Sequence, residues 1–228
     1  MTDAVREHAI ETIPARVHGT FLVREPAVAG EPAETPLLVG FHGYGETAEK
    51  HLAELTRIPG TQSWRLVAVQ ALHPFYTRTN EVVASWMTRF DREHAIADNA
   101  AYVGAVVARL RERAPRGPLV YAGFSQGVAT AYRAAAKSGH ACQGIVALGG
   151  DVPELTPQDL AGLPAVLIGG GLKEAFYTPA RLAADVARLT GAGVDARPVP
   201  YEGGHEWTDA FREEAGRFLD EVLAGFRD

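Results

Sequence analysis

A serine flanked by two glycines, Gly123-Phe124-Ser125-Gln126-Gly127, follows an apolar run and precedes an alanine-rich stretch typical of a helix. A G-x-S-x-G pattern between a strand and a helix is typical of a tight turn that exposes a serine hydroxyl at a sheet edge. The glycines leave room for the strand and the helix to approach, and the helix N-terminus favours developing negative charge. The pattern predicts that Ser125 is a nucleophile, and a glycine-rich turn with Ser125 as a helix N-cap is the alternative.

A serine hydroxyl needs a general base, and in this arrangement the base follows the serine in the chain. His205 comes directly after the last predicted strand and before the last predicted helix. Gly203 and Gly204 let its loop carry the imidazole over the sheet edge. His73 lies in a loop that could face the site, but it precedes the serine. We therefore predict that His205 is the base.

The acid that orients the base is less sharply defined by the sequence. Asp151 and Glu174 each follow the end of a predicted strand, whereas Glu202 is too near His205 in the chain to fold back onto it. Glu174 is favoured because its strand directly precedes that of His205 and because three glycines let its loop turn toward the imidazole. Asp151 remains the alternative acid.

Attack on a carbonyl also requires two N–H groups that hold the developing oxyanion. One is expected from Gln126, the residue after the nucleophile, and the other from a loop after an early strand. The segment Phe41-His42-Gly43-Tyr44-Gly45 fits that loop, and we predict that the Tyr44 N–H is the second donor. His42 is expected to hold the shape of this loop by hydrogen bonding.

The elements that must position these residues alternate along the chain between short apolar runs and longer helical patterns. Strands are predicted at residues 37–41, 66–69, 119–122, 145–148, 165–168 and, interrupted by two prolines and therefore nearer an edge, 194–201. Residues 16–23 partly alternate, which favours an antiparallel edge strand. Helices are predicted from about residue 48, over 91–113, over 126–138, from 178 and over 207–226. This order indicates an α/β protein with a mostly parallel, doubly wound sheet in a single domain spanning residues 1–228.

The bulk composition excludes several classes of function. A net charge of −6 argues against a nucleic-acid surface, and no stretch approaches the length of a membrane span. The single cysteine, Cys142, is expected to be a packed thiol, and the N-terminal segment lacks the apolar stretch of a signal peptide, so a cytoplasmic protein is expected. No residues cluster with metal-ligand spacing, and the chemistry calls for no cofactor. A homodimer is compatible with this composition.

At these motifs the sequence resembles the phospholipase/carboxylesterase family of α/β-hydrolases, which includes acyl-protein thioesterases. The matching segments are residues 38–46, the Phe-Ser-Gln-Gly form of the serine turn, and Gly203-Gly204-His205. The resemblance implies that Ser125 is the nucleophile, His205 the base, and Tyr44 and Gln126 the oxyanion donors. It also places Trp86 in a loop near the acyl site, and a tryptophan packed in the core is the alternative there. The family usually has aspartate where Glu174 falls.

The substrate is predicted less closely than the reaction. Aromatic and apolar residues in predicted loops could line an acyl pocket, with Trp86 and Phe176 as the substrate-binding candidates among Phe75, Tyr76, Trp86, Met87, Phe176 and Tyr177. No long inserted segment forms a lid, which favours carboxylic esters or thioesters of small or medium acyl chains. A peptidase or lactone hydrolase on the same fold and a non-catalytic binding protein are the alternatives.

Overall fold

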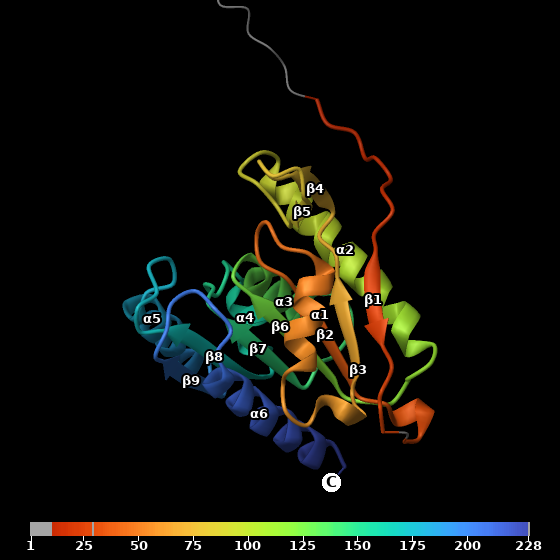
Figure 1. The fold of residues 1–228 in the computed structure, drawn as a ribbon, viewed down its shortest axis with the longest axis vertical. Coiled ribbons are helices and arrows are strands. Elements are labelled where there is room, and N and C mark those ends of the chain that lie inside the picture. The colour runs from red at the N-terminus through yellow and green to blue at the C-terminus, as the bar shows by residue number, and fades with distance from the viewer. Residues whose placement is uncertain (1–10, 29, 228) are drawn as a thin grey trace, which may run out of the picture.

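The computed structural model describes residues 11–28 and 30–227, and its centre is a twisted seven-stranded sheet (Figure 1). Every neighbouring pair of strands is parallel except β1 with β3. In spatial order the strands are β1 (Phe21–Arg24), β3 (Arg65–Val69), β2 (Leu37–Phe41), β6 (Leu119–Phe124), β7 (Gly144–Leu148), β8 (Ala165–Gly171) and β9 (Ala196–Tyr201). Residues 1–10, part of the segment used to predict that a signal peptide is absent, lie outside the described residues.

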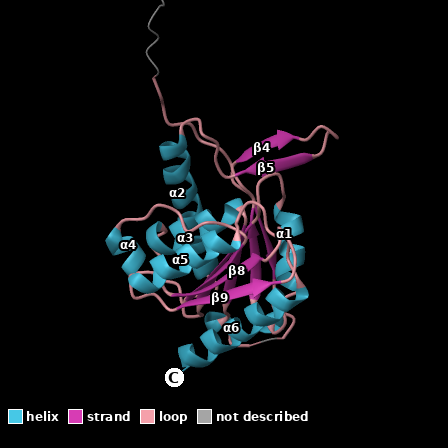
Figure 2. Cartoon of the chain, turned by 90° about the vertical axis from the view of Figure 1, so that its left-hand side faces the viewer, coloured by secondary structure: helices cyan, strands magenta, loops and turns pink. Residues whose placement is uncertain are grey.

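Helices cover both faces of the sheet, as Figure 2 shows with the sheet seen nearly edge-on. The helices on one face are α2 (Arg92–Arg111), α3 (Gln126–Lys137), the short α4 (Pro157–Ala161) and α5 (Pro179–Gly191). The opposite face is covered by α1 (Ala48–Thr56) and α6 (Asp209–Arg227). The predicted doubly wound α/β class is therefore confirmed.

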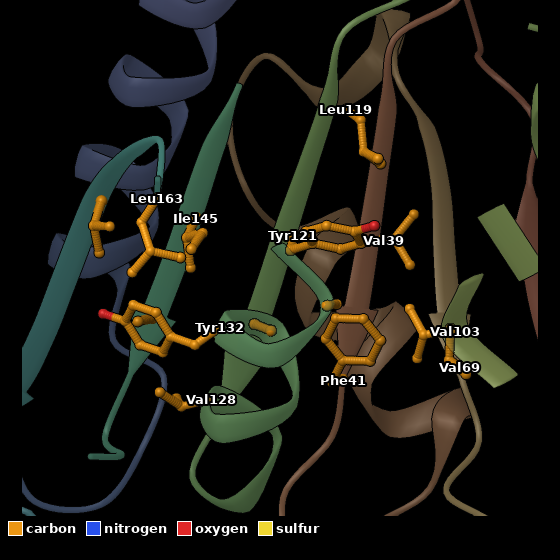
Figure 3. Close-up of a cluster of buried hydrophobic side chains, with 14 of the residues drawn as sticks. Val39, Phe41, Val69, Val103, Leu119, Tyr121, Val128, Tyr132, Ile145 and Leu163 are labelled. Atoms are coloured by element: carbon orange, nitrogen blue, oxygen red, sulfur yellow. The ribbon is translucent and has the colours of Figure 1, made fainter. Parts of the chain in front are cut away.

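Strand β2 shows how the sequence builds two cores with one strand. Val39 and Phe41 point into the core beneath α2 and α3 (Figure 3), and Leu37 belongs to the same core. Leu38 instead points into the core beneath α1 and α6. Side chains on a strand alternate between faces, so an all-apolar strand buries both. Each such apolar side chain contributes roughly 1.5–3 kcal/mol on burial. The end of β2 is thereby fixed, together with the loop that follows Phe41.

The predicted strands are confirmed to within a few residues, and the ends that differ have a visible cause. Strand β9 lies at one edge of the sheet, as its two prolines indicated, and β1 lies at the other as an antiparallel strand. The prediction that β1 begins at residue 16 was wrong. The partner strand β3 ends at Val69, which lies opposite Phe21 in the antiparallel pair. The residues before Phe21 therefore have little strand to pair with.

The loop expected between residues 73 and 85 is instead an antiparallel hairpin of β4 (His73–Tyr76) and β5 (Val82–Ser85) that projects from the main sheet (Figure 2). Its turn depends on Asn80, which has a φ of 65°, and on the Thr77 hydroxyl, which accepts hydrogen bonds from two turn amides. At its base, Ala84 pairs with Glu46 of the loop after β2. The hairpin thus supports the loop in which an oxyanion donor was predicted.

One buried imidazole in α1 is unrelated to the predicted site chemistry. His51 is only 1% exposed, and neither ring nitrogen has a hydrogen-bond partner among the described residues. Its ring fills the space left by Gly40, since a Cβ there would lie 2.6 Å from the imidazole. Burial, with a smaller contribution from the charge of His42, lowers the pKa of His51 from 6.5 to about 3.

We expect this imidazole to destabilise the fold in acid. Because the unfolded chain binds the proton more readily, stability falls as pH drops below about 6.5 and continues to fall to about 3. Between pH 7 and 4.5 this amounts to about 2–3 kcal/mol. Urea unfolding should show that the free energy of unfolding of His51→Leu falls less than that of the wild type between pH 7 and 4.5, by the same amount. His18→Leu, at an exposed histidine, serves as the control. Equal acid sensitivity of the wild type and His51→Leu would contradict this expectation.

Candidate active site

The carboxyl ends of four parallel strands bring the predicted site residues to one edge of the sheet. Ser125 follows β6, the loop of residues 42–46 follows β2, Glu174 follows β8, and His205 follows β9. Strand β2 pairs directly with β6, whereas β8 and β9 lie on the other side of it, beyond β7. Open α/β sheets place their chemistry at this edge, where loops can converge.

Ser125 lies in a strained turn between β6 and α3. Its φ of 54° and ψ of −119° are angles that residues other than glycine rarely adopt. A Cβ at Gly123 would lie 2.6 Å from the carbonyl oxygen of Gly127. A Cβ at Gly127 would lie 2.1 Å from the carbonyl oxygen of Phe41. Neither position can carry a side chain, which explains the glycines on both sides of the serine. The Ser125 N–H extends the β6–β7 ladder by donating to Leu148 over 2.8 Å.

Three predicted residues form one continuous hydrogen-bonded chain. The Ser125 hydroxyl lies 2.8 Å from Nε2 of His205, and Nδ1 of the same ring lies 2.5 Å from Oε2 of Glu174. The imidazole packs at 4.9 Å on the ring of Phe124, which is buried beneath it. A neutral imidazole in this arrangement carries its proton on Nδ1 and offers Nε2 to the hydroxyl.

The structure brings Glu174 to the imidazole and places the other carboxylates elsewhere. The Glu174 side chain is fully buried, and its second oxygen accepts the Phe176 N–H over 2.7 Å. Burial alone would raise the pKa of Glu174, but the hydrogen bonds from Phe176 and His205 hold that pKa below its usual value. Asp151 is exposed and pairs with Arg181 at 3.3 Å, and Glu202 lies 3.7 Å from Lys173.

The loop after β2 is held by side chains that fix its peptide planes. His42 is fully buried; its Nε2 accepts the Ala71 N–H over 3.1 Å, so its Nδ1 carries the proton and donates to the Gly43 carbonyl over 2.8 Å. Burial lowers the pKa of His42, although the hydrogen bond to Gly43 opposes this. The hydrogen bonds with Ala71 and Gly43 together select the neutral tautomer that carries its proton on Nδ1. The C=O and N–H of a trans peptide point in opposite directions. Since the Gly43 carbonyl faces the His42 imidazole, the N–H of Tyr44 in the same peptide is turned away from that ring.

Both predicted oxyanion donors keep a free N–H within the part of the chain that the structure describes. The Tyr44 amide donates to no acceptor there, and Gln126 is the first residue of α3, whose amide has no partner within the helix. The loop lies against the serine, since a Cβ at Gly43 would be 3.3 Å from the Ser125 Cβ. The Gly43 amide itself is occupied, because it donates to Glu46 over 2.9 Å.

Of the two interpretations of Trp86, the structure favours the core residue over the wall of an open pocket. Its side chain is fully buried, and its indole N–H donates to the His42 carbonyl over 2.8 Å. The ring is therefore part of the core, and it braces the loop after β2 from below. The side chain of Gln126 holds the same region, accepting from the Trp86 amide over 2.9 Å and donating to the Met87 carbonyl over 2.9 Å.

Two exposed aromatic groups flank the serine. Phe176 is 74% exposed, and its ring meets His205 edge-on at 5.7 Å. On the other side, Tyr44 is 62% exposed and stacks at 5.3 Å on Phe75 of the hairpin. Cys142, in contrast, is largely enclosed, and burial raises the pKa of its thiol to about 12, in agreement with a packed, unreactive thiol.

Sequence reasoning missed several supports of the site. Glu46, the indole of Trp86 and the amide side chain of Gln126 all act through contacts with residues distant in the chain or with backbone groups. Glu46 and Gln126 are polar residues within the two motif segments, and this position was the only sign in the sequence that their side chains support the site. The ring of Phe124 beneath His205 gave no signal, because an aromatic residue at the end of a buried strand is ordinary.

Two further observations concern the described part of the chain. No three His, Cys, Asp or Glu side chains among these residues are arranged to hold a metal ion. Within the same ranges, every helix is too short or too polar to cross a bilayer.

Comparison with known proteins places the chain in a family. A sequence model of the phospholipase/carboxylesterase family matches residues 24–168. A search of curated proteins finds no match. Among solved structures, esterase PE8 is 23% identical, with a TM-score of 0.72 over 91% of this chain and 100% of that one.

Two other solved structures have the same fold at lower identity. Zea mays acyl-protein thioesterase 2 is 18% identical, with a TM-score of 0.71 over 90% of this chain and 100% of that one. A Bacillus cereus carboxylesterase is 16% identical, with a TM-score of 0.69 over 90% and 94% of the two chains. The family match extends over more than half of the sequence and includes the strand and turn that carry Ser125. The chain therefore belongs to the phospholipase/carboxylesterase family of α/β-hydrolases.

Proposed function

We propose that this protein is a serine hydrolase that cleaves carboxylic esters or thioesters of small or medium acyl chains through an acyl-enzyme. The observation that carries the proposal is the hydrogen-bonded chain from Ser125 through His205 to Glu174. A nucleophile, a base and an orienting acid in this geometry form the constellation that acyl transfer to serine requires. The buried carboxylate suits the task, since its hydrogen bonds favour the charged form that stabilises an imidazolium.

In the proposed first step, Ser125 Oγ attacks the substrate carbonyl while Nε2 of His205 takes the hydroxyl proton. The C–O bond that forms converts the carbonyl oxygen into an oxyanion, which the N–H groups of Tyr44 and Gln126 hold. His205 then gives its proton to the oxygen or sulfur of the leaving group, and the bond to that atom breaks. Water attacks the resulting acyl-enzyme by the same route and releases the acid and Ser125. Protein side chains, backbone amides and water suffice for these steps.

The His42 side chain is expected to matter for rate although it is too deeply buried to touch substrate. In His42→Ala the Gly43–Tyr44 peptide loses the contact that directs its N–H, so one oxyanion donor is misplaced. Loss of one such donor lowers kcat by about 10²–10³-fold. Steady-state kinetics should show this fall with little change in KM. His42→Asn, whose amide can still donate to Gly43, should recover part of the rate, and equal loss in both variants would contradict the assignment.

The substrate class can be tested with one panel of compounds. We expect p-nitrophenyl esters from acetate to octanoate, and thioesters of the same acids, to be hydrolysed fastest at short to medium chain length. An aminoacyl p-nitroanilide should be hydrolysed far more slowly, because its amine is a poorer leaving group. Ser125→Ala serves as the blank for contaminating hydrolases.

Other outcomes of that panel select the alternatives. Faster cleavage of the anilide than of the esters would identify a peptidase, and a preference for γ-lactones would identify a lactone hydrolase. No turnover of any compound by the folded wild type would favour a binding protein. The cytoplasmic location and the homodimer stay predictions.

A further inference from the structure

We propose that the Phe176 side chain forms the subsite for the alcohol portion of the substrate and selects esters of apolar, aromatic alcohols. The inference rests on the proposed function and adds which part of the ester the residue recognises. Phe176 is 74% exposed, and the centroid of its ring lies 5.7 Å from that of the His205 ring in an edge-to-face arrangement. Ligand sites are lined mainly by apolar and aromatic side chains, so an exposed aromatic ring beside the reacting groups is a candidate for contact with substrate.

The imidazole does not need this ring for support. His205 is already fixed at Nδ1 by Glu174 and on one face by the buried ring of Phe124 at 4.9 Å. What Phe176 gives to the triad is its backbone, because its N–H donates to Oε1 of Glu174 over 2.7 Å. The backbone is thus committed to structure, whereas the side chain is free to meet a ligand. A substitution that removes only the ring keeps the backbone contact.

The chemistry of the proposed reaction determines which part of the ester lies beside this ring. His205 must deliver its proton to the leaving oxygen, so that oxygen has to approach Nε2 within hydrogen-bonding distance. The carbonyl oxygen is instead drawn to the amides of Tyr44, in the loop after β2, and of Gln126, the residue after the nucleophile. The alcohol portion therefore lies on the side of β8 and β9, which is the side that carries Phe176.

The charges around Phe176 favour an uncharged partner. In the same loop Lys173 is matched by Glu202 at 3.7 Å, and Arg181, in the first turn of the helix that follows, is matched by Asp151 at 3.3 Å. Leu172, in the same loop, adds an aliphatic side chain that is 48% exposed. With these charges paired and apolar side chains exposed, the subsite suits an aromatic alcohol that can pack against the Phe176 ring.

The test compares two acetate esters whose leaving alcohols have similar acidity but different polarity. We expect the wild type to prefer benzyl acetate to 2-methoxyethyl acetate in kcat/KM. In Phe176→Ala this preference should fall about three- to tenfold, and Phe176→Leu should be intermediate. Ratios within an acyl series of ethyl esters should stay unchanged in both variants. Phe226→Ala, at a half-exposed ring near the end of α6, is the matched control.

Other outcomes of this test would assign the Phe176 ring to a different role. An equal fall on both acetates would show that the ring merely supports His205, and a shift in the ethyl ester series would place it at the acyl side. Either result overturns the inference and leaves the proposed hydrolase intact. Absence of ester hydrolysis in the wild type would overturn the proposed function as well. Melting curves confirm that each variant is folded.

Discussion

Replacement of His205 by alanine is expected to lower kcat for p-nitrophenyl acetate by about 10⁴–10⁶-fold, with the fold intact. Without an acceptor at 2.8 Å, the Ser125 hydroxyl keeps its proton and remains a weak nucleophile. The leaving group also loses its proton donor. Because the proposed mechanism uses both residues in one proton transfer, the double variant Ser125→Ala/His205→Ala should be no slower than either single variant.

The matched control for this prediction is another histidine near the same sheet edge. His73 of β4 is exposed, and His73→Ala should retain nearly the wild-type rate. Stopped-flow and steady-state assays on purified, folded variants measure the difference. A His205→Ala protein that keeps more than a few per cent of the rate would show that another group serves as the base.

Replacement of Glu174 is expected to have the second largest effect. Glu174→Gln should lower kcat by about 10³–10⁴-fold, because the amide N–H favours the imidazole tautomer that cannot accept the serine proton. Glu174→Asp should lie between glutamine and wild type. The shorter side chain cannot reach both Nδ1 of His205 and the Phe176 N–H, which the glutamate joins at 2.5 and 2.7 Å.

Asp151→Asn distinguishes the two carboxylates that the sequence left open. The structure pairs Asp151 with Arg181 on the surface, so its variant should keep the wild-type kcat. Values of kcat measured for the Asp151 and Glu174 variants at one pH decide which carboxylate orients His205. If Asp151→Asn has the larger loss, the loop after β8 is not the source of the acid.

The sequence was sufficient where local pattern decides structure. The apolar strands bury both faces, so their positions could be predicted, and the glycines around Ser125 indicated a turn because only glycine fits those close contacts. The order of strand ends then brought the loops of Ser125, Glu174 and His205 to one edge. The choice between Glu174 and Asp151 was open because both follow strand ends, and only the path of the loops separates them.

The remaining features depend on contacts between distant segments. The β4–β5 hairpin is partly exposed and mixes polar with apolar residues, so its pattern gave no strand signal, and it is tied to the loop after β2 through Ala84 and Glu46. Trp86 was left open between a pocket wall and the core, because an aromatic residue in a predicted loop suits either place. Its indole N–H instead has a buried carbonyl partner, and no property of the local sequence indicates this.

Covalent labelling with a fluorophosphonate tests the central claim most directly, because this reagent reacts with a serine only when a base and an oxyanion site activate it. Mass spectrometry of the folded wild type should show one adduct, located on Ser125. Ser125→Ala should show none, and His205→Ala should react at a greatly reduced rate. Failure of Ser125 to react in the folded wild type, or reaction at a different residue, would contradict the account.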